Sequence, residues 1–261
     1  YEKLDVKISA IDIKNNKNGG ILTSHSFQGH NHNNLIWHNG GDGIYSIGTN
    51  SMTGDGSAGV FSELRFYYND GYGMNIQQGN VDIVGPRNRS MSNQKSGIYL
   101  AEGNLEAHNV AVAGNKEHGL HIGGSTRLVG GSLANNKGYG LLAGGATDLK
   151  GVNIYGNEQG GIRLYGEGSN SLAKRNISFW ENNITQKLAP NHLFTAMNIH
   201  ANGSVGVEHD GELPLTITAS NILKHTSYGV SAEAAAVIAT NNWWGDASGP
   251  AGLASGSGDA I

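Results

Sequence analysis

Apolar and polar positions alternate along this chain in short runs, and one recurring pattern joins each run to the next. The pattern is apolar, x, x, Asn, x, x, x, Gly, apolar, and the alternation continues beyond the Gly, as in 98–100 and 120–122. An alternation with a period of two predicts short β-strands with one apolar side. Clear copies of the pattern are found at 13–21, 36–44, 66–74, 112–120, 133–141, 154–162 and 199–207, and imperfect copies at 90–98, 179–187 and 222–230.

The glycines of this pattern set the length of one repeat. They occupy positions 20, 43, 73, 97, 119, 140, 161, 206 and 229, so most successive steps are 21 to 24 residues. We interpret the step of 30 as one repeat with an insertion near 50–58, and the step of 45 as two repeats with the weak copy at Asn182 between them. A unit of about 22 residues that recurs about ten times indicates a solenoid.

Each repeat is expected to form one coil made of a strand, a corner, a second strand and a loop. Parallel stacking places equivalent residues about 4.8 Å apart, so the repeated Asn side chains can hydrogen-bond to one another as a ladder. The Gly is expected to give the corner a positive φ. The predicted ladder residues are Asn16, Asn39, Asn69, Asn93, Asn115, Asn136, Asn157, Asn202 and Asn241.

Composition excludes several other classes of protein. The 41 glycines among 261 residues argue against helices, because each would cost about 1 kcal/mol in a helix interior. A net charge of −4 with no basic stripe argues against a nucleic-acid partner. No run of about 20 apolar residues is present that could span a membrane, and the absence of cysteine excludes disulfides and thiolate metal sites.

The Asn-x-x-x-Gly-apolar repeat over residues 11–245 resembles that of the right-handed parallel β-helix superfamily, the pectate-lyase-like fold. The ending "NNWWGDASGPAG" followed by "GSGDAI" is similar to the closing motif of secreted bacterial β-helix repeat proteins. The resemblance implies an all-β, single-stranded parallel β-helix that forms one domain over residues 1–261, as a segment of a longer protein. Members of this superfamily include polysaccharide lyases, glycoside hydrolases, uronan epimerases, phage tailspikes and adhesins, so the fold alone leaves the function open.

Outward side chains of successive strands are expected to form columns along the solenoid. Tyrosine rings stack on sugars and arginine pairs with carboxylates, so a column of both types is a candidate anionic-glycan groove. The simpler alternative is an ordinary solvated sheet face. The candidate carbohydrate-binding residues are Tyr45, Tyr72, Tyr99, His121, Tyr139 and Arg163. The candidate catalytic residues are His118, His121, Tyr99 and Arg163.

No catalytic signature accompanies these columns. Glycoside hydrolysis needs two carboxylates at a set separation, and the outward column between Tyr45 and Arg163 contains none. The chain also lacks the Asp-Pro-His motif of uronan epimerases with this fold, and the Asp-Asp pair with Gly-His-Gly of polygalacturonases. These departures from the family weigh against enzymatic activity.

Two clusters are weak candidates for metal binding, and no other cofactor is expected. Glu208, Asp210 and Glu212 could supply oxygen ligands to Ca²⁺. His30 and His32, one residue apart, could hold Zn²⁺ or a copper ion if they lie on a strand. The simpler alternatives are a solvated turn and a histidine-rich surface loop.

Two functions of different classes follow from these observations. The first is a non-catalytic extracellular or cell-surface β-helix, an adhesin or filament-forming segment that contacts polysaccharide or surface glycan and self-associates end to end through its strand edges. The second is a polysaccharide lyase or uronan epimerase that acts on an acidic polysaccharide. The regular repeat and the missing catalytic motifs favour the first.

The pair Trp243–Trp244 has a structural and a functional interpretation. Flanked by Asn and Asp, it could be a sugar-binding patch. However, "NNWWG" at 241–245 is itself an Asn-x-x-x-Gly corner, and Asp246 replaces the inward apolar residue that should follow. We therefore expect residues 241–261 to close the solenoid, with at least one indole covering the end of the core and both tryptophans contributing to thermal stability.

Overall fold

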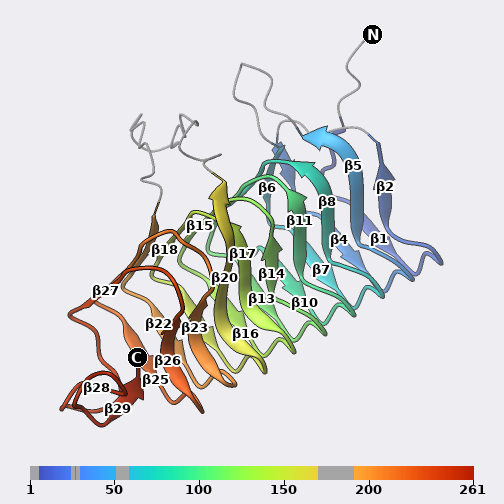
Figure 1. Ribbon diagram of the computed structural model, residues 1–261. Helices are drawn as coiled ribbons and strands as arrows, with labels where there is room; N and C mark the ends of the chain where they lie inside the picture. Colours follow the sequence, from blue (N-terminus) through green and yellow to red (C-terminus); the bar gives the residue numbers. More distant parts are fainter. Residues whose placement is uncertain (1–5, 25–26, 28–29, 51–58, 170–190) are drawn as a thin grey trace.

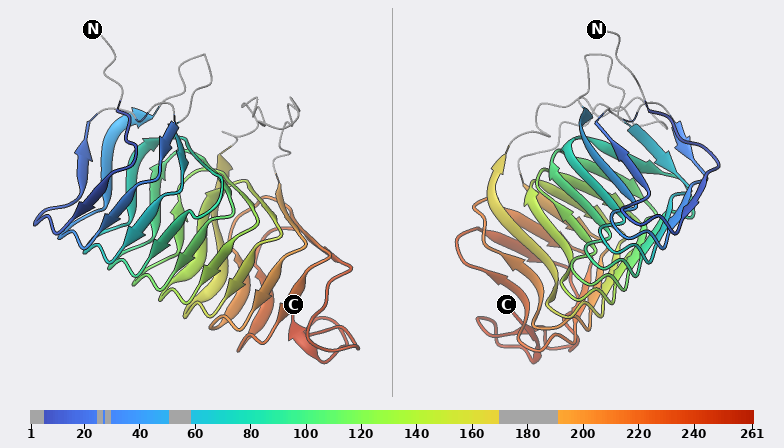
Figure 2. Two further views of the ribbon diagram at one scale, coloured as in Figure 1. Left: turned by 180° about the vertical axis from the view of Figure 1, so that it is seen from behind. Right: turned by 90° about the vertical axis from the view of Figure 1, so that its right-hand side faces the viewer.

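The chain is a parallel β-helix. The computed structural model describes residues 6–24, 27, 30–50, 59–169 and 191–261, and within these ranges it contains strands and turns but no helix. Each coil contributes one strand to each of three parallel sheets, and the coils stack into an elongated body with the first coil and the C-terminal residues at opposite ends (Figure 1). Figure 2 shows the same stack from behind and from the side. The predicted all-β solenoid is thus confirmed.

The three sheets follow one another around each coil. The first sheet contains β1 (Asp12–Lys14), β4 (Leu35–Trp37), β7 (Arg65–Tyr67), β10 (Arg89–Met91), β13 (Ala111–Ala113), β16 (Ser132–Ala134), β19 (Asn153–Tyr155), β22 (Asn198–His200) and β25 (Asn221–Leu223). The second sheet contains β2 (Ile21–Thr23), β5 (Ile44–Asn50), β8 (Met74–Gly79), β11 (Ile98–Glu102), β14 (Leu120–Ile122), β17 (Tyr139–Gly145), β20 (Gly160–Ser169), β23 (Val205–His209) and β26 (Tyr228–Ala232). The third sheet contains β3 (His30–His32), β6 (Gly59–Ser62), β9 (Val81–Val84), β12 (Leu105–His108), β15 (Thr126–Val129), β18 (Thr147–Lys150), β21 (His192–Thr195), β24 (Leu215–Thr218) and β27 (Val237–Thr240). Two short strands, β28 (Pro250–Ala251) and β29 (Gly258–Ala260), pair at the C-terminal end.

The number of coils is smaller than the ten expected from the sequence. Each sheet has nine strands, which corresponds to about eight steps between successive coils. The difference arises at the 45-residue step, because β19 pairs directly with β22, with Asn153 opposite Asn198. This step is therefore one coil with a long excursion. The weak copy at 179–187 falls within 170–190 and lies outside the described residues.

Apolar residues before the ladder Asn and after the Gly fill the interior of the stack. Ile36 and Phe66 are paired in neighbouring strands of the first sheet, and both are buried. The second sheet shows the same pairing of buried residues in neighbouring strands, with Leu120 between Ile98 and Leu141. One continuous hydrophobic core therefore runs along the axis, and its burial is the main stabilising term of the fold.

The asparagine ladder is confirmed at eight positions. From Asn16 to Asn157, each Asn donates its backbone N–H and its side-chain Nδ2 to the Oδ1 of the Asn in the next coil, at 2.9–3.2 Å. Asn202 is the last asparagine, and its Nδ2 lies 3.4 Å from Nε2 of His225. Asp259 then ends the ladder by accepting from the backbone N–H of His225 at 3.0 Å and from its imidazole Nδ1 at 2.5 Å.

The prediction for Asn241 was wrong by a shift in register. Asn221 pairs with Trp243 in an isolated parallel bridge, so Asn241 lies opposite Ala219 rather than at the ladder position. Both residues have a positive φ, 57° for Asn241 and 51° for Ala219. The ladder position beyond His225 is filled by Asp259, which comes from the end of the chain.

The repeated glycines are required for space rather than for backbone conformation. None of the nine glycines of the pattern has a positive φ, which corrects the expectation for the corner. Instead the left-handed residue is the one before the ladder Asn, such as Asn15 and Asn135. A Cβ on Gly43 would lie 2.5 Å from the carbonyl oxygen of Gly73 in the next coil and 2.9 Å from the ring of Phe66.

We expect Gly43→Ala to lower the free energy of unfolding by about 2–3 kcal/mol, because the added methyl overpacks the interior between two coils. Gly114→Ala is the matched control, since it adds a methyl group at a left-handed corner residue. At the equivalent corner of another coil the chain already has an alanine, Ala201, with a φ of 50°. That control should cost about 1 kcal/mol. Urea denaturation of both variants measures the difference, and a larger loss for the control would contradict the steric explanation.

The C-terminal segment covers the end of the core with one tryptophan. Trp244 is 5% exposed and belongs to the hydrophobic core, whereas Trp243 is 47% exposed. The backbone of Trp243 continues the first sheet, because its N–H donates to Ser220 and its carbonyl accepts from Ile222, both at 2.8 Å. The two indoles thus occupy different environments. Within the described ranges, the structure contains no helix of the length and apolarity needed to cross a membrane.

Candidate functional site

The register of the second sheet brings the predicted outward column together. Tyr99 pairs with Asn75 in β8 and with His121 in β14. Further along, Leu142 pairs with Arg163, which pairs with Glu208 in β23. These side chains alternate with buried apolar ones, so they lie on the outer face of the sheet.

Aromatic rings from successive coils are in contact on this face. Tyr72 stacks on Tyr99 with ring centroids 5.0 Å apart, and Tyr99 meets His121 edge-on at 4.9 Å. His118 contacts His121 at 5.6 Å and stacks on Tyr139 at 5.9 Å. Tyr72, His118 and Tyr139, which directly precede a Gly of the repeat, therefore form one cluster with Tyr99 and His121. All five are among the candidates named from the sequence.

Tyr165 is a member of this cluster that the sequence analysis missed. Its hydroxyl lies 3.2 Å from Nε2 of His121, and the two rings meet edge-on at 6.1 Å. Tyr165 follows Arg163 by two positions in β20, so extending the period-two alternation beyond the first outward residue would have found it. We use the term aromatic face for Tyr72, Tyr99, His118, His121, Tyr139 and Tyr165.

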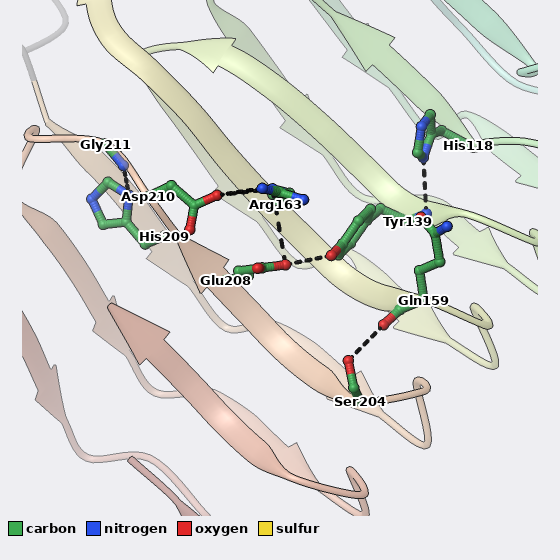
Figure 3. Close-up of polar contacts among 9 residues, drawn as sticks. All are labelled: His118, Tyr139, Gln159, Arg163, Ser204, Glu208, His209, Asp210 and Gly211. Carbon is green, nitrogen blue, oxygen red and sulfur yellow. Dashed lines mark hydrogen bonds and ion pairs between the residues drawn. The ribbon is translucent and has the colours of Figure 1, made fainter. Parts of the chain in front are cut away.

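One margin of the aromatic face is an ionic cluster around Arg163 (Figure 3). The Arg163 guanidinium binds Asp210 at 2.8 Å and lies 4.0 Å from Glu208. Glu208 also accepts a short hydrogen bond from the hydroxyl of Tyr139, and the guanidinium sits 5.9 Å from the Tyr139 ring centre. The positive charge of Arg163 is thus already paired with two carboxylates.

The opposite margin contains hydrogen-bonded polar groups and a small cavity. Asp42 accepts from the backbone N–H of Tyr72 at 2.9 Å and from Nδ2 of Asn75 at 2.7 Å. Lys95 extends over the Tyr72 ring, with its Nζ 4.8 Å from the centroid. Tyr45 lies beyond Asn75, outside the ring contacts of the aromatic face, and lines a cavity of about 250 Å³ together with Leu22 and residues 18–21.

Burial shifts the titration of the rings away from neutral pH. It raises the pKa of Tyr72 to about 12. Burial and the hydrogen bond to Glu208 raise the pKa of Tyr139 to about 12 as well. Burial, followed by the charge of His118, lowers the pKa of His121 to about 4, and burial also lowers the pKa of His118. At pH 7 the phenols of Tyr72 and Tyr139 and the imidazoles of His118 and His121 are therefore neutral.

The described residues contain no group of three or more side chains that could hold a metal ion. Glu208 and Asp210, the candidates for Ca²⁺, instead bind the guanidinium of Arg163. His32 contacts the hydroxyl of Ser9 at 3.0 Å. The side chain of His30 lies outside the described part of the structure.

Comparison of the chain with models of known protein families, with curated proteins and with solved structures gave no significant match. The fold defines the chain as a parallel β-helix protein. Because a fold does not specify a function, the function is inferred from the geometry of the aromatic face.

Proposed function

We propose that this protein is a non-catalytic extracellular β-helix that binds a neutral polysaccharide along its aromatic face. The observation that carries the proposal is the continuous row of partly exposed rings from Tyr72 to Tyr165, which runs along the axis of the solenoid. Ring hydroxyls and imidazole nitrogens in this row can hydrogen-bond to sugar hydroxyls, while the ring carbons contact the apolar side of a pyranose.

The charges around the aromatic face favour a neutral ligand over the acidic one expected from the sequence. The four carboxylates of Asp42, Glu117, Glu208 and Asp210 surround it, with Lys95 and Arg163 as the cations that contact it. Arg163 would have to leave Asp210 and Glu208 before it could bind a uronate. Like charges across an interface disfavour binding, so an acidic polysaccharide is the poorer partner.

The same geometry favours binding over lyase or epimerase chemistry. Abstraction of a proton from a uronate requires a base with a suitable pKa and a free cation that neutralises the substrate carboxylate. The pKa values of Tyr72 and Tyr139 are raised to about 12, that of His121 is lowered to about 4, and Arg163 is ion-paired. Lyase or epimerase activity in the pectate-lyase-like superfamily remains the alternative proposal.

Tyr99→Ala is expected to weaken binding of a neutral polysaccharide about tenfold. Tyr99 joins the Tyr72 ring to that of His121, and an aromatic contact contributes up to about 1.5 kcal/mol, where about 1.4 kcal/mol corresponds to a factor of ten. Affinity electrophoresis in gels that contain neutral or uronate polymers measures the effect.

Tyr155→Ala is the matched control for this experiment. Tyr155 stacks on His200 at 5.2 Å, but it lies on the first sheet, away from the aromatic face. Equal binding losses in both variants would refute the assignment to the second sheet. Incubation with uronate polymers tests the alternative function, because a lyase releases unsaturated ends that absorb in the ultraviolet. Such release, abolished by His121→Ala, would replace the binding proposal by the catalytic one.

A cell-surface role agrees with the mechanical character of the fold. Backbone hydrogen bonds and the asparagine ladder both run along the axis, so the solenoid is suited to holding a glycan-binding face at a distance from an anchoring point. Surface labelling of intact cells of the source organism, together with assay of the culture medium, would test this location. Protein found only after the cells are lysed would contradict it.

A further inference from the structure

A second group of aromatic rings lies on the first sheet, at its corner with the second sheet. Trp37 and Tyr67 are paired at the ends of β4 and β7, and the chain continues from them into His38 and Tyr68. His38 stacks on Tyr68 with centroids 5.0 Å apart and planes 13° apart, and Trp37 contacts His38 at 5.0 Å. We use the term corner platform for these four residues.

The backbone of the corner platform is unfavourable for the residues it carries. His38 has a φ of 51° and Tyr68 a φ of 54°, in the left-handed region that bulky residues avoid. The equivalent corner residues of the other coils are Asn15, Ser92, Gly114, Asn135, Gly156, Ala201 and Lys224. Two adjacent coils thus carry aromatic rings at a corner position where the other coils have small or flexible residues. Backbone strain of this kind concentrates at functional sites.

The rings of the corner platform are accessible and have polar groups beside them. Tyr68 is 54% exposed, and among the described residues its ring contacts are with His38 and Tyr67. The indole N–H of Trp37 donates to Asp12 at 2.8 Å, and Nζ of Lys14 lies 5.1 Å from the Trp37 ring. The exposed ring of Tyr68 offers an apolar surface that can stack on a pyranose. Asp12 and Lys14, which pair with each other at 3.4 Å beside Trp37, are the polar groups at the other end of the corner platform.

We propose that the corner platform is a second carbohydrate-binding site, which takes a pyranose unit of a neutral glycan on the exposed ring of Tyr68. The site lies on a different sheet from the aromatic face and uses none of its residues, so it does not depend on the function proposed above. Two such sites on one rigid body bind a long polysaccharide more tightly than either alone, because the second contact is intramolecular.

The decisive variant is Tyr68→Asn, because asparagine adopts a positive φ more readily than tyrosine. If the ring serves ligand binding, Tyr68→Asn removes binding at this site while the melting temperature stays the same or rises. A structural role for the ring predicts the opposite, a lower melting temperature. Ser92→Asn is the matched control, since it introduces the same residue at the corresponding position of the next coil, where the native side chain is not a ring.

The binding experiment uses an array of neutral hexopyranose oligosaccharides, probed with the Tyr99→Ala protein, in which binding at the aromatic face is expected to be about tenfold weaker. We expect this protein to retain binding, Tyr68→Asn in that background to reduce it at least about tenfold, and Ser92→Asn to leave it unchanged. Unchanged binding with Tyr68→Asn, a lowered melting temperature, or no binding by the Tyr99→Ala protein would each overturn the proposal. If Tyr99→Ala binds like the wild type, the aromatic-face proposal fails, and Tyr68→Asn still tests the corner platform.

Discussion

Asn115→Ala is expected to lower the free energy of unfolding by about 3–5 kcal/mol, since several buried groups lose their partners at about 1–3 kcal/mol each. The Oδ1 of Asn115 accepts from both the backbone N–H and the Nδ2 of Asn93 at 3.0 Å. Its own Nδ2 donates to Oδ1 of Asn136 at 3.0 Å and to the carbonyl of Ser90 at 3.1 Å. Asn93, Asn115 and Asn136 are all fully buried, so water cannot replace these bonds.

Asn16→Ala is the control for the ladder, because it makes the same truncation at the exposed first rung. Asn16 donates to Oδ1 of Asn39 but has no preceding rung to support among the described residues. Its loss should cost less than about 1 kcal/mol, the usual net value of an exposed hydrogen bond. Urea unfolding monitored by circular dichroism gives both values. Similar costs for the two variants would show that the ladder contributes little beyond its backbone contacts.

Trp244→Ala is expected to destabilise the C-terminal coils by about 3–5 kcal/mol, the range for truncation of a large buried aromatic side chain. Trp244 packs at the end of the hydrophobic core, and its carbonyl accepts from the backbone N–H of Asp259 at 2.8 Å. Asp259 in turn holds His225. The loss of the indole should therefore loosen the closing segment as well as the core. Because contacts in a solenoid are between neighbouring coils, amide exchange should increase most in β25 to β29.

Trp243→Ala is the matched control for this substitution. Its indole is half-exposed and its role in the first sheet is carried by backbone atoms, which alanine keeps. We expect a loss below about 1 kcal/mol, so that of the two tryptophans expected from the sequence to contribute to thermal stability, Trp244 contributes most of the effect. Equal melting temperatures for the two variants would contradict the assignment of Trp244 as the closing residue.

The repeat made much of the fold predictable. In a stack of similar units, a contact between coils joins residues one repeat apart, so the period alone identifies the partners of Asn115 or Leu120. The predicted cluster of Tyr72, Tyr99, His118, His121 and Tyr139 was correct for this reason, because the repeat length there is regular. Where the period breaks, prediction fails, as at the 45-residue step and at Asn241.

The sequence by itself determined two of the three strands of each coil, the inward apolar residues and the asparagine ladder from Asn16 to Asn202, because these depend on local periodicity and on equal spacing. The strand of the third sheet, where a loop was expected, was decided by the tertiary structure. Only the tertiary structure decided how Arg163 is used, since Asp210, its partner at 2.8 Å, lies 47 residues further along the chain across an irregular step. The same holds for Asp259, which completes the ladder at His225 from a segment outside the repeat. Such contacts depend on where loops return the chain, and no period in the sequence encodes that path.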